Sequence, residues 1–244
     1  MESALKELPE MALMDHLKEL RTRLIRGFCI VTVLGFSAYS YVPDAIKILS
    51  VPLLEKFPKN VLIGTGPAEA MTLRFSVSFA LGLIVALPYI MWEIWGFISP
   101  ALYKTEKKMI LPFVGITTFC FLLGSFFSYK IILPITFGFF SDQYVELGLQ
   151  PQIRISEHIS LTIQLLIAFG LIFELPILSF VLARLGILKF NFLLNATRYI
   201  IAGIFIVSAI LTPPDVVSQL LMAGPLLVMF VISLIVVKFT EKEI

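Results

Sequence analysis

The chain has 244 residues, of which 58% are hydrophobic and 15% are charged, and its mean hydropathy is +0.95. Soluble domains are about 45–50% apolar and about 25% charged, so this composition excludes an ordinary soluble protein and indicates a membrane protein. The net charge of +2 excludes a large basic surface for nucleic acid. Cys29 and Cys120 lie in apolar runs without CxxC spacing, so no disulfide framework, metal site or cofactor is predicted.

Six continuous apolar runs predict an all-α membrane protein with a single membrane domain spanning residues 1–244. The predicted spans are residues 24–42, 73–97, 110–134, 160–183, 199–211 and 217–237. The fifth, 199–211, corresponds to only about 20 Å of helix. The sixth is interrupted by Gly224-Pro225. A short pair at the C-terminus is expected to thin the bilayer locally or to be shielded by partners.

The distribution of Lys and Arg predicts the orientation of the spans. Thirteen of the 19 Lys and Arg residues lie in the two terminal segments and the loops on the same side, so both termini are expected in the cytoplasm. The charged leader extends to Arg26, which is too long for an ordinary signal peptide, so it is expected to be retained. The two long external segments, 43–72 and 135–159, contain several prolines, including Pro52 as a structural residue, and are expected to form ordered caps.

The stretch MDHLKELRTRLIRG, residues 14–27, precedes the first span. Its leucines repeat at helical spacing, and Glu19 and Arg23 stand at the favourable i,i+4 positions for an ion pair. An interfacial helix that fixes the topology explains the leucines and the basic residues. It does not explain Glu19 or His16.

The loop WGFISPALYKTEKK, residues 95–108, follows the second span. Trp95, Phe97 and Tyr103 are typical of an aromatic belt at the membrane interface, and Glu106 lies among lysines. Local charge pairing in an interfacial turn explains Glu106 equally well. If Glu19 and Glu106 share one face, they offer two carboxylates to a cationic ligand, and the planar arginine side chain fits them best.

Glu174 lies in AFGLIFELP, residues 168–176, about 15 Å along the helix from the nearer end of its span. A charge at mid-membrane costs about 2.5–3.5 kcal/mol on insertion scales, so the residue is a candidate functional group. A neutral carboxyl that bonds to another helix is the structural alternative, and Pro176 frees a backbone carbonyl nearby.

The stretch LTPPDVVSQ, residues 211–219, connects the last two spans. Thr212 is predicted to cap the sixth span, with Pro213 and Pro214 opening it and Asp215 in its first turn, all in structural roles. Gln219 enters the membrane one turn later and is a candidate for an intramembrane polar contact. Enzyme motifs such as HExxH and GxSxG do not occur, so no catalysis is predicted.

With these motifs in order, the chain resembles the TatC family, the six-span subunit of the twin-arginine protein translocase. The similarity runs from His16 to Gln219 and includes HLKELRTRL before the first span and VPLL at 51–54. The three stretches at 95–108, 168–176 and 211–219 complete it.

The resemblance implies a cupped, glove-like bundle in the bacterial cytoplasmic (inner) membrane that serves as a receptor for signal peptides carrying consecutive arginines on folded precursors. Glu19 and Glu106 would contact the arginine pair, with Phe97, His16 and Arg21 in the same patch. The family also implies single-span partner subunits of the TatA or TatB type, an oligomeric complex, and dependence on the proton-motive force.

The resemblance also implies that Glu174 lies inside the concave face of the bundle. One departure is notable, because this chain has Phe230-Val231 where the family often has a Glu in the last span. Two alternatives remain open at this point. One is a proton-coupled transporter with Glu174 as a relay, and the other is a structural scaffold for partner spans.

Overall fold

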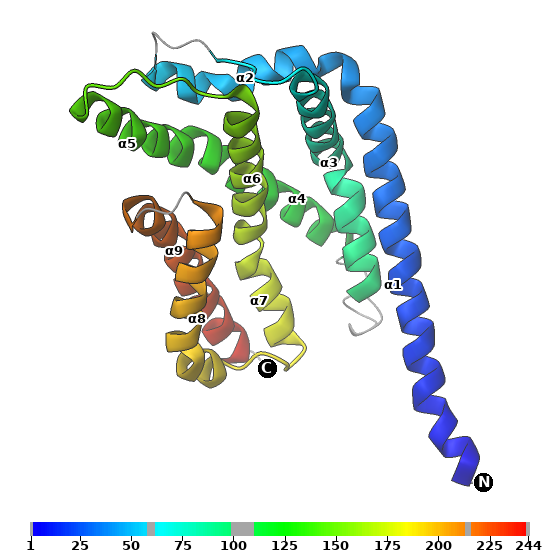
Figure 1. The fold of residues 1–244 in the computed structure, drawn as a ribbon. Helices are drawn as coiled ribbons and strands as arrows, with labels where there is room; N and C mark the ends of the chain where they lie inside the picture. Colours follow the sequence, from blue (N-terminus) through cyan, green and yellow to red (C-terminus); the bar gives the residue numbers. More distant parts are fainter. Residues whose placement is uncertain (1, 58–61, 99–109, 213–215, 243–244) are drawn as a thin grey trace. The chain divides into compact units, whose positions relative to one another are not determined.

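The computed structural model describes residues 2–57, 62–98, 110–212 and 216–242, and Figure 1 shows that they are almost entirely helical. The long helices are α1 (Glu2–Ala38), α2 (Val42–Lys56), α3 (Glu69–Ile98), α4 (Ile110–Phe127), α5 (Leu133–Glu146), α6 (Ile155–Phe173), α7 (Leu175–Arg184), α8 (Phe190–Leu211) and α9 (Val216–Lys242). A 3₁₀ turn, η1 (Tyr39–Tyr41), joins α1 to α2, and a π-helix, η4 (Ser128–Ile132), joins α4 to α5.

Six helical stretches in the described part of the chain are long and apolar enough to cross a membrane. They are Met14–Lys56, Glu69–Ile98, Leu111–Glu146, Ile155–Arg184, Phe190–Leu211 and Val216–Glu241. Each overlaps one predicted span, so the all-α class and the number and order of the spans are confirmed. The orientation of the termini, the cupped arrangement and the single domain stay predictions.

The last two spans are the shortest of the six, at 22 and 26 residues, but the fifth is longer than predicted. α8 begins at Phe190 rather than at residue 199, because polar residues such as Asn191, Asn195 and Arg198 interrupt the apolar run without interrupting the helix. α9 also continues through Gly224 and Pro225, so the predicted interruption is wrong. A proline removes one backbone hydrogen bond, which a long packed helix tolerates.

The chain forms two compact units, and each is described here by itself. The first consists of residues 1–41 and 78–118, and the second of residues 42–77 and 119–244. One boundary lies between η1 and α2, and the other two fall within α3 and α4, so these two helices contribute residues to each unit.

In the first unit, α1 runs beside α3 (Figure 1), and small residues allow their backbones to approach. A Cβ atom added at Gly82 would collide with the backbone of Gly35 and with the Val31 carbonyl. The Ser78 hydroxyl donates a hydrogen bond to the Gly35 carbonyl at the same level. Membrane helices pack by close approach of their backbones at small residues, because the hydrophobic effect does not drive helices together in lipid.

Trp95 is buried within the protein, and its place in the predicted interfacial belt stays a prediction. Its side chain is buried between α3 and α4, where the indole stacks on Phe113 with ring centroids 4.8 Å apart. Its Nε1–H donates to Thr117 Oγ1 at 3.2 Å. The indole is buried because its one polar group finds a partner on the neighbouring helix.

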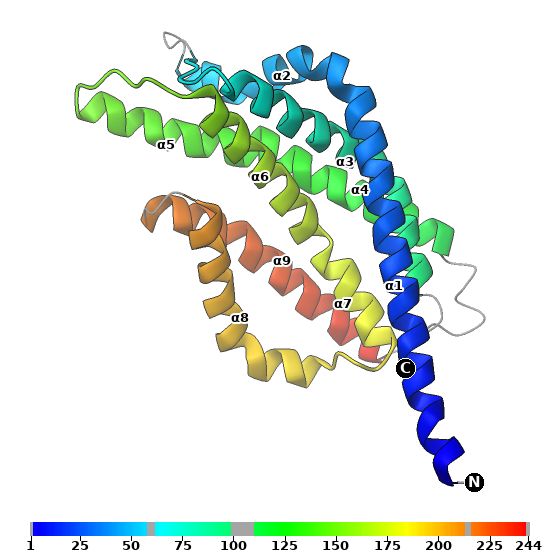
Figure 2. The ribbon, with the colours of Figure 1, turned by 45° about the vertical axis from the view of Figure 1, so that its right-hand side comes forward.

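In the second unit, α7 and α8 both pack against α9 (Figure 2), and the core includes Phe169, Leu165 and Met222. α4 and α6 approach closely at two glycines. A Cβ atom at Gly124 would collide with the Phe169 carbonyl, and one at Gly170 would collide with the Phe121 ring.

The two segments predicted as ordered external caps contain α2 and α5, which pack against each other. Pro52 lies buried inside α2, and the Tyr129 hydroxyl donates to the Ile48 carbonyl at 2.7 Å. Among the described residues, the only extended pairing is an isolated bridge between Ile63 and Arg154, which joins the residues after α2 to the start of α6. The described residues of both segments are largely helical, and their place outside the membrane as ordered caps stays a prediction.

The approach of α4 to α6 predicts a position-specific cost for adding one methyl group. Gly124→Ala is expected to destabilise the protein by about 1–3 kcal/mol, because the backbone of Phe169 cannot move aside easily. Gly115→Ala, on the same helix, is the matched control, since no atom lies within 4 Å of its added Cβ. Thermal unfolding in detergent measures both variants, and equal melting temperatures would contradict the packing described.

Candidate functional site

α1 carries the acidic residue that the sequence singled out, Glu19, one helical turn before Arg23. Arg23 donates from Nε and from Nη2 to the same Glu19 oxygen, Oε1, at 3.0 Å and 2.7 Å. The favourable i,i+4 order of Glu and Arg therefore forms the ion pair expected from the sequence. Both bonds are charge-assisted, which makes them among the stronger hydrogen bonds in proteins.

The same guanidinium also binds a second carboxylate, on α3. Arg23 Nη1 donates to Glu93 Oε2 at 2.9 Å and to the Glu93 carbonyl at 3.4 Å. The Tyr89 hydroxyl donates to the other Glu93 oxygen at 2.7 Å, so both oxygens of this buried carboxylate are bonded. Arg23 therefore bridges α1 and α3 within the first unit.

Glu93 is a residue of the site that sequence reasoning missed. The sequence feature that could have identified Glu93 is the one that identified Glu174, namely a carboxylic acid within an apolar run. For Glu93 this run is MWEIWGF. Its place near the end of the second span made it resemble an interfacial residue. Only the structure reveals that it faces Arg23, more than sixty residues earlier.

The backbone of α3 leaves room for Arg23 at Gly96. A Cβ atom at this position would collide with Arg23 Nη1 and crowd the rest of the guanidinium. The guanidinium can therefore lie against the helix surface between Glu93 and Gly96. The glycine matters here for the space that it leaves, since its backbone is helical.

His16 and Phe97 come together beside Glu19. Their rings stack with centroids 4.2 Å apart and an interplanar angle of 14°. The ion-pair partner of Glu19 Oε2 is His16 Nδ1 at 3.9 Å, which is beyond hydrogen-bond distance. Among the described residues, Oε2 therefore has no hydrogen-bond donor, in contrast to Oε1.

Of the predicted binding residues, the structure thus unites Glu19, His16 and Phe97 in one place. Arg21 lies exposed on the same helix. Glu106 lies outside the described residues, as do Pro213, Pro214 and Asp215. Their predicted roles stay predictions.

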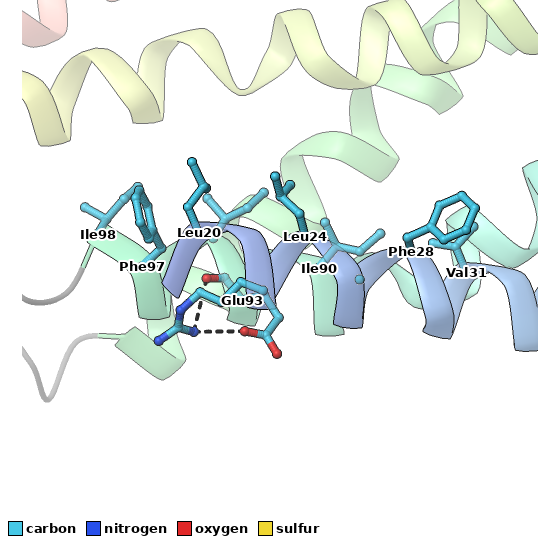
Figure 3. A pocket seen from close by; sticks show the side chains of 11 residues that line it. Leu20, Leu24, Phe28, Val31, Ile90, Glu93, Phe97 and Ile98 are labelled. Atoms are coloured by element: carbon cyan, nitrogen blue, oxygen red, sulfur yellow. Dashed lines mark hydrogen bonds and ion pairs between the residues drawn. The ribbon is translucent and has the colours of Figure 1, made fainter. Parts of the chain in front are cut away.

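An apolar groove of about 530 Å³ extends from this cluster along α1 and α3 (Figure 3). Phe97 and Ile98 lie at one end, and Phe28 and Val31 lie at the other. The dashed lines in Figure 3 mark the two bonds to Glu93, which with Arg23 forms the polar part of the lining. Its walls otherwise consist of aliphatic and aromatic side chains, so the groove suits an apolar occupant.

In the second unit, Glu174 occupies the joint between α6 and α7. Pro176 follows two residues later and has no N–H to donate, so it opens a new helix instead of continuing the old one. The main chain stays largely paired, with the Leu178 N–H donating to the Glu174 carbonyl at 2.9 Å. Glu174 Oε1 is buried and has no hydrogen-bond partner among the described residues.

Gln219 contacts another helix, as its position in an apolar run led us to expect. Its Nε2 donates to the Phe205 carbonyl at 3.0 Å, which joins α9 to α8. Thr212 follows the last residue of α8, and its hydroxyl donates back to the Ser208 carbonyl at 2.8 Å. Threonine can satisfy its hydroxyl in this way on the preceding turn, which the sequence pattern did not reveal. Residues 213–215 lie outside the described residues, so the predicted cap on the sixth span stays a prediction.

Metal binding finds no support in the described residues, where no group of three His, Cys, Asp or Glu side chains could hold an ion. The chemistry that the first unit offers is recognition by charge and shape. A carboxylate oxygen that has no donor among the described residues, a stacked aromatic pair and an apolar groove lie next to one another.

Comparison with known protein families gives a consistent result. The family model described as Sec-independent protein translocase protein (TatC) matches residues 15–225. The TatC protein of Azotobacter chroococcum is 35% identical over 225 residues, which cover 92% of this chain and 88% of that protein. The TatC protein of Campylobacter jejuni is 36% identical over 229 residues, which cover 93% of each chain.

Solved structures agree with the sequence comparison. A crystal structure of the twin-arginine translocase receptor TatC superposes with a TM-score of 0.85 at 34% identity, covering 92% of this chain and 99% of that one. A second crystal structure of the receptor, in the detergent DDM, gives a TM-score of 0.84 at 35% identity. The resemblance drawn from five short motifs is therefore confirmed.

The bridge from Arg23 to Glu93 predicts an asymmetric response to alanine substitution along α1. Arg23→Ala leaves the buried Glu93 carboxylate short of its partner and is expected to lower the free energy of unfolding by roughly 1–3 kcal/mol. Arg21→Ala, two residues earlier and exposed, is the control and should change it by less than about 0.5 kcal/mol. Unfolding of the purified protein in detergent compares the two, and equal losses would contradict a structural role for the bridge.

Proposed function

Because this chain belongs to the TatC family of Sec-independent protein translocase proteins, we propose that it is the receptor subunit that binds twin-arginine signal peptides of folded precursors. It is a multi-pass protein of the bacterial inner membrane. The observation that carries the proposal is the cluster of Glu19, His16 and Phe97, in which one Glu19 oxygen has no donor from the part of the chain that the structure describes.

Arginine is the natural guest for such a carboxylate. Its guanidinium is planar and presents two parallel N–H groups, whereas the lysine ammonium offers one compact charge. The flat face of the guanidinium can also lie on an aromatic ring, and the stacked pair of His16 and Phe97 offers one beside Glu19. Glu106 supplies the second carboxylate, for the second arginine of the pair.

The apolar part of the signal then enters the membrane next to the charged site. The groove that starts at Phe97 supports this step, because it continues from the acidic cluster with an apolar lining. In the second unit, Glu174 offers a hydrogen-bonding group to the incoming signal or to a partner helix. Its buried oxygen without a described partner supports this role.

The remaining parts of the proposal follow from charge distribution and family. Both termini and the acidic cluster lie on the cytoplasmic side, which the excess of Lys and Arg in those segments supports. Single-span subunits of the TatA or TatB type join this chain in an oligomeric complex that depends on the proton-motive force. The chain contributes recognition and assembly, with no catalytic step of its own.

Removing both proposed carboxylates tests the recognition step. Glu19→Ala combined with Glu106→Ala is expected to weaken binding of a twin-arginine peptide at least about ten-fold, since each charge-assisted contact contributes about 1.5–3 kcal/mol before losses at a wet interface. Binding is measured on inverted membrane vesicles, which expose the cytoplasmic face, with a paired-lysine peptide as the reference ligand.

Asp15→Ala is the matched control for this experiment. Asp15 is an exposed acid on the same helix, and it pairs with Lys18 at 3.0 Å rather than with the cluster. The control should bind the peptide as tightly as the unchanged protein. Unaltered affinity in the double variant, or binding only at the opposite face of the membrane, would falsify the proposed function.

Substitutions at Glu174 separate the proposal from a proton-coupled transporter. If Glu174 acts as a hydrogen-bonding group, Glu174→Gln should keep most export of a reporter precursor, while Glu174→Leu should lose most of it. A proton relay needs a group that titrates, so glutamine would then be as inactive as leucine. Equal loss in both variants, at equal protein levels in the membrane, would favour the relay.

A further inference from the structure

Arg23 competes with the arginine of the signal peptide for the Glu19 carboxylate, because both carry a guanidinium. It is the same kind of side chain, on the same helix as Glu19, and it already donates two hydrogen bonds to Oε1. Unrestrained, a guanidinium and a carboxylate prefer a fork with one N–H group on each oxygen. In that arrangement Arg23 would occupy both oxygens of Glu19.

The structure departs from this fork in one respect. Both bonds from Arg23 end on Oε1, while Oε2 has no donor among the described residues. The remaining terminal nitrogen of Arg23, Nη1, points to α3 instead, where the Glu93 side chain and carbonyl accept from it. The open backbone at Gly96 gives the guanidinium room to lie there.

Glu93 is suited to hold Arg23 in this position. Its carboxylate is buried, and its second oxygen is fixed by the Tyr89 hydroxyl at 2.7 Å. It cannot turn toward a peptide without giving up both partners. Glu19, in contrast, is partly exposed, with 37% of its side chain accessible.

We propose that Glu93 is a positioning residue for signal recognition, which holds Arg23 on α3 so that Glu19 keeps one carboxylate oxygen for a guanidinium of the incoming peptide. This inference rests on the proposed function and identifies what sets its specificity. Glu19 and Glu93 both accept hydrogen bonds from the Arg23 guanidinium. Glu19 Oε2, which Arg23 leaves without a bond, is then available to the arginine of the peptide. Without Glu93, Arg23 closes the fork on Glu19 and the guest must displace it.

A merely structural role for Glu93 predicts something different. If the bridge only ties α1 to α3, then removing Glu93 lowers stability and removing Arg23 as well brings no recovery of binding. If Glu93 positions Arg23, then removing Arg23 from a protein that lacks Glu93 frees Glu19 again. Arg23→Gln should therefore restore the peptide binding that Glu93→Gln loses.

The test compares four variants of the full chain in inverted vesicles, with fluorescent peptides that carry either paired arginines or paired lysines. Glu93→Gln should weaken binding of the paired-arginine peptide about ten-fold and reduce its advantage over the paired-lysine peptide. Glu93→Gln combined with Arg23→Gln should return the affinity to that of the unchanged protein or above. Asp15→Ala, which removes an exposed acid on α1 that pairs with Lys18 instead of Arg23, is the control and should bind normally.

Glu19→Gln is the fourth variant, and it distinguishes a failure of the proposed function from a failure of the positioning role of Glu93. If it binds the peptide normally, Glu19 is not the recognition group and the proposed function falls, together with this inference. If it binds weakly while Glu93→Gln binds normally, the proposed function stands and the positioning role is overturned. Failure of Arg23→Gln to rescue Glu93→Gln overturns it as well.

Gly96→Ala provides a second route if Glu93→Gln does not accumulate in the membrane. The added methyl group pushes the guanidinium off α3 while leaving every charge in place. It should weaken paired-arginine binding in the same direction as Glu93→Gln, and Arg23→Gln should again relieve the effect. Normal binding by a folded Gly96→Ala protein contradicts the inference.

Discussion

A single guanidinium held between carboxylates from two helices organises the first unit of this protein. Within or near a bilayer, an unpaired charge is costly, so Arg23 and Glu93 must satisfy each other wherever water is scarce. That need fixes the rotation of α1 against α3 at this level. It also determines where Glu19, one turn earlier on α1, presents its carboxylate. The recognition that we propose and the packing of α1 on α3 therefore depend on the same ion pair.

The second unit meets the same constraint in another way. Its acid, Glu174, has a buried Oε1 with no hydrogen-bond partner among the described residues, and it lies where α6 ends and α7 begins, next to Pro176. A broken helix has carbonyl groups that can accept hydrogen bonds, which lowers the cost of a polar side chain there. The two acids in apolar runs thus have different environments, one paired by charge and one placed at a break in the backbone.

Much of the fold follows from the sequence because hydrophobic length is a strong signal. The six spans and the pairing of Glu19 with Arg23 could be predicted from local pattern alone, but the start of α8 and the continuity of α9 through Pro225 could not. Other features that the sequence did not reveal depend on partners far along the chain. Buried Trp95 donates its N–H to Thr117 on α4. Glu93 on α3 belongs to the site because it accepts a hydrogen bond from Arg23 on α1. Local pattern contains no information about such partners.

The π-helix between α4 and α5 changes the helical register of the residues that follow it. A π turn accommodates an extra residue, so everything after Ile132 is rotated by roughly one residue's angle, about 100°, from where an unbroken α-helix would place it. Phe137 and Thr136 are buried in α5, after this offset. A helical wheel drawn through the whole third span without the offset would misplace them by about 100°, and deleting one residue from the π turn would rotate α5 by about the same angle.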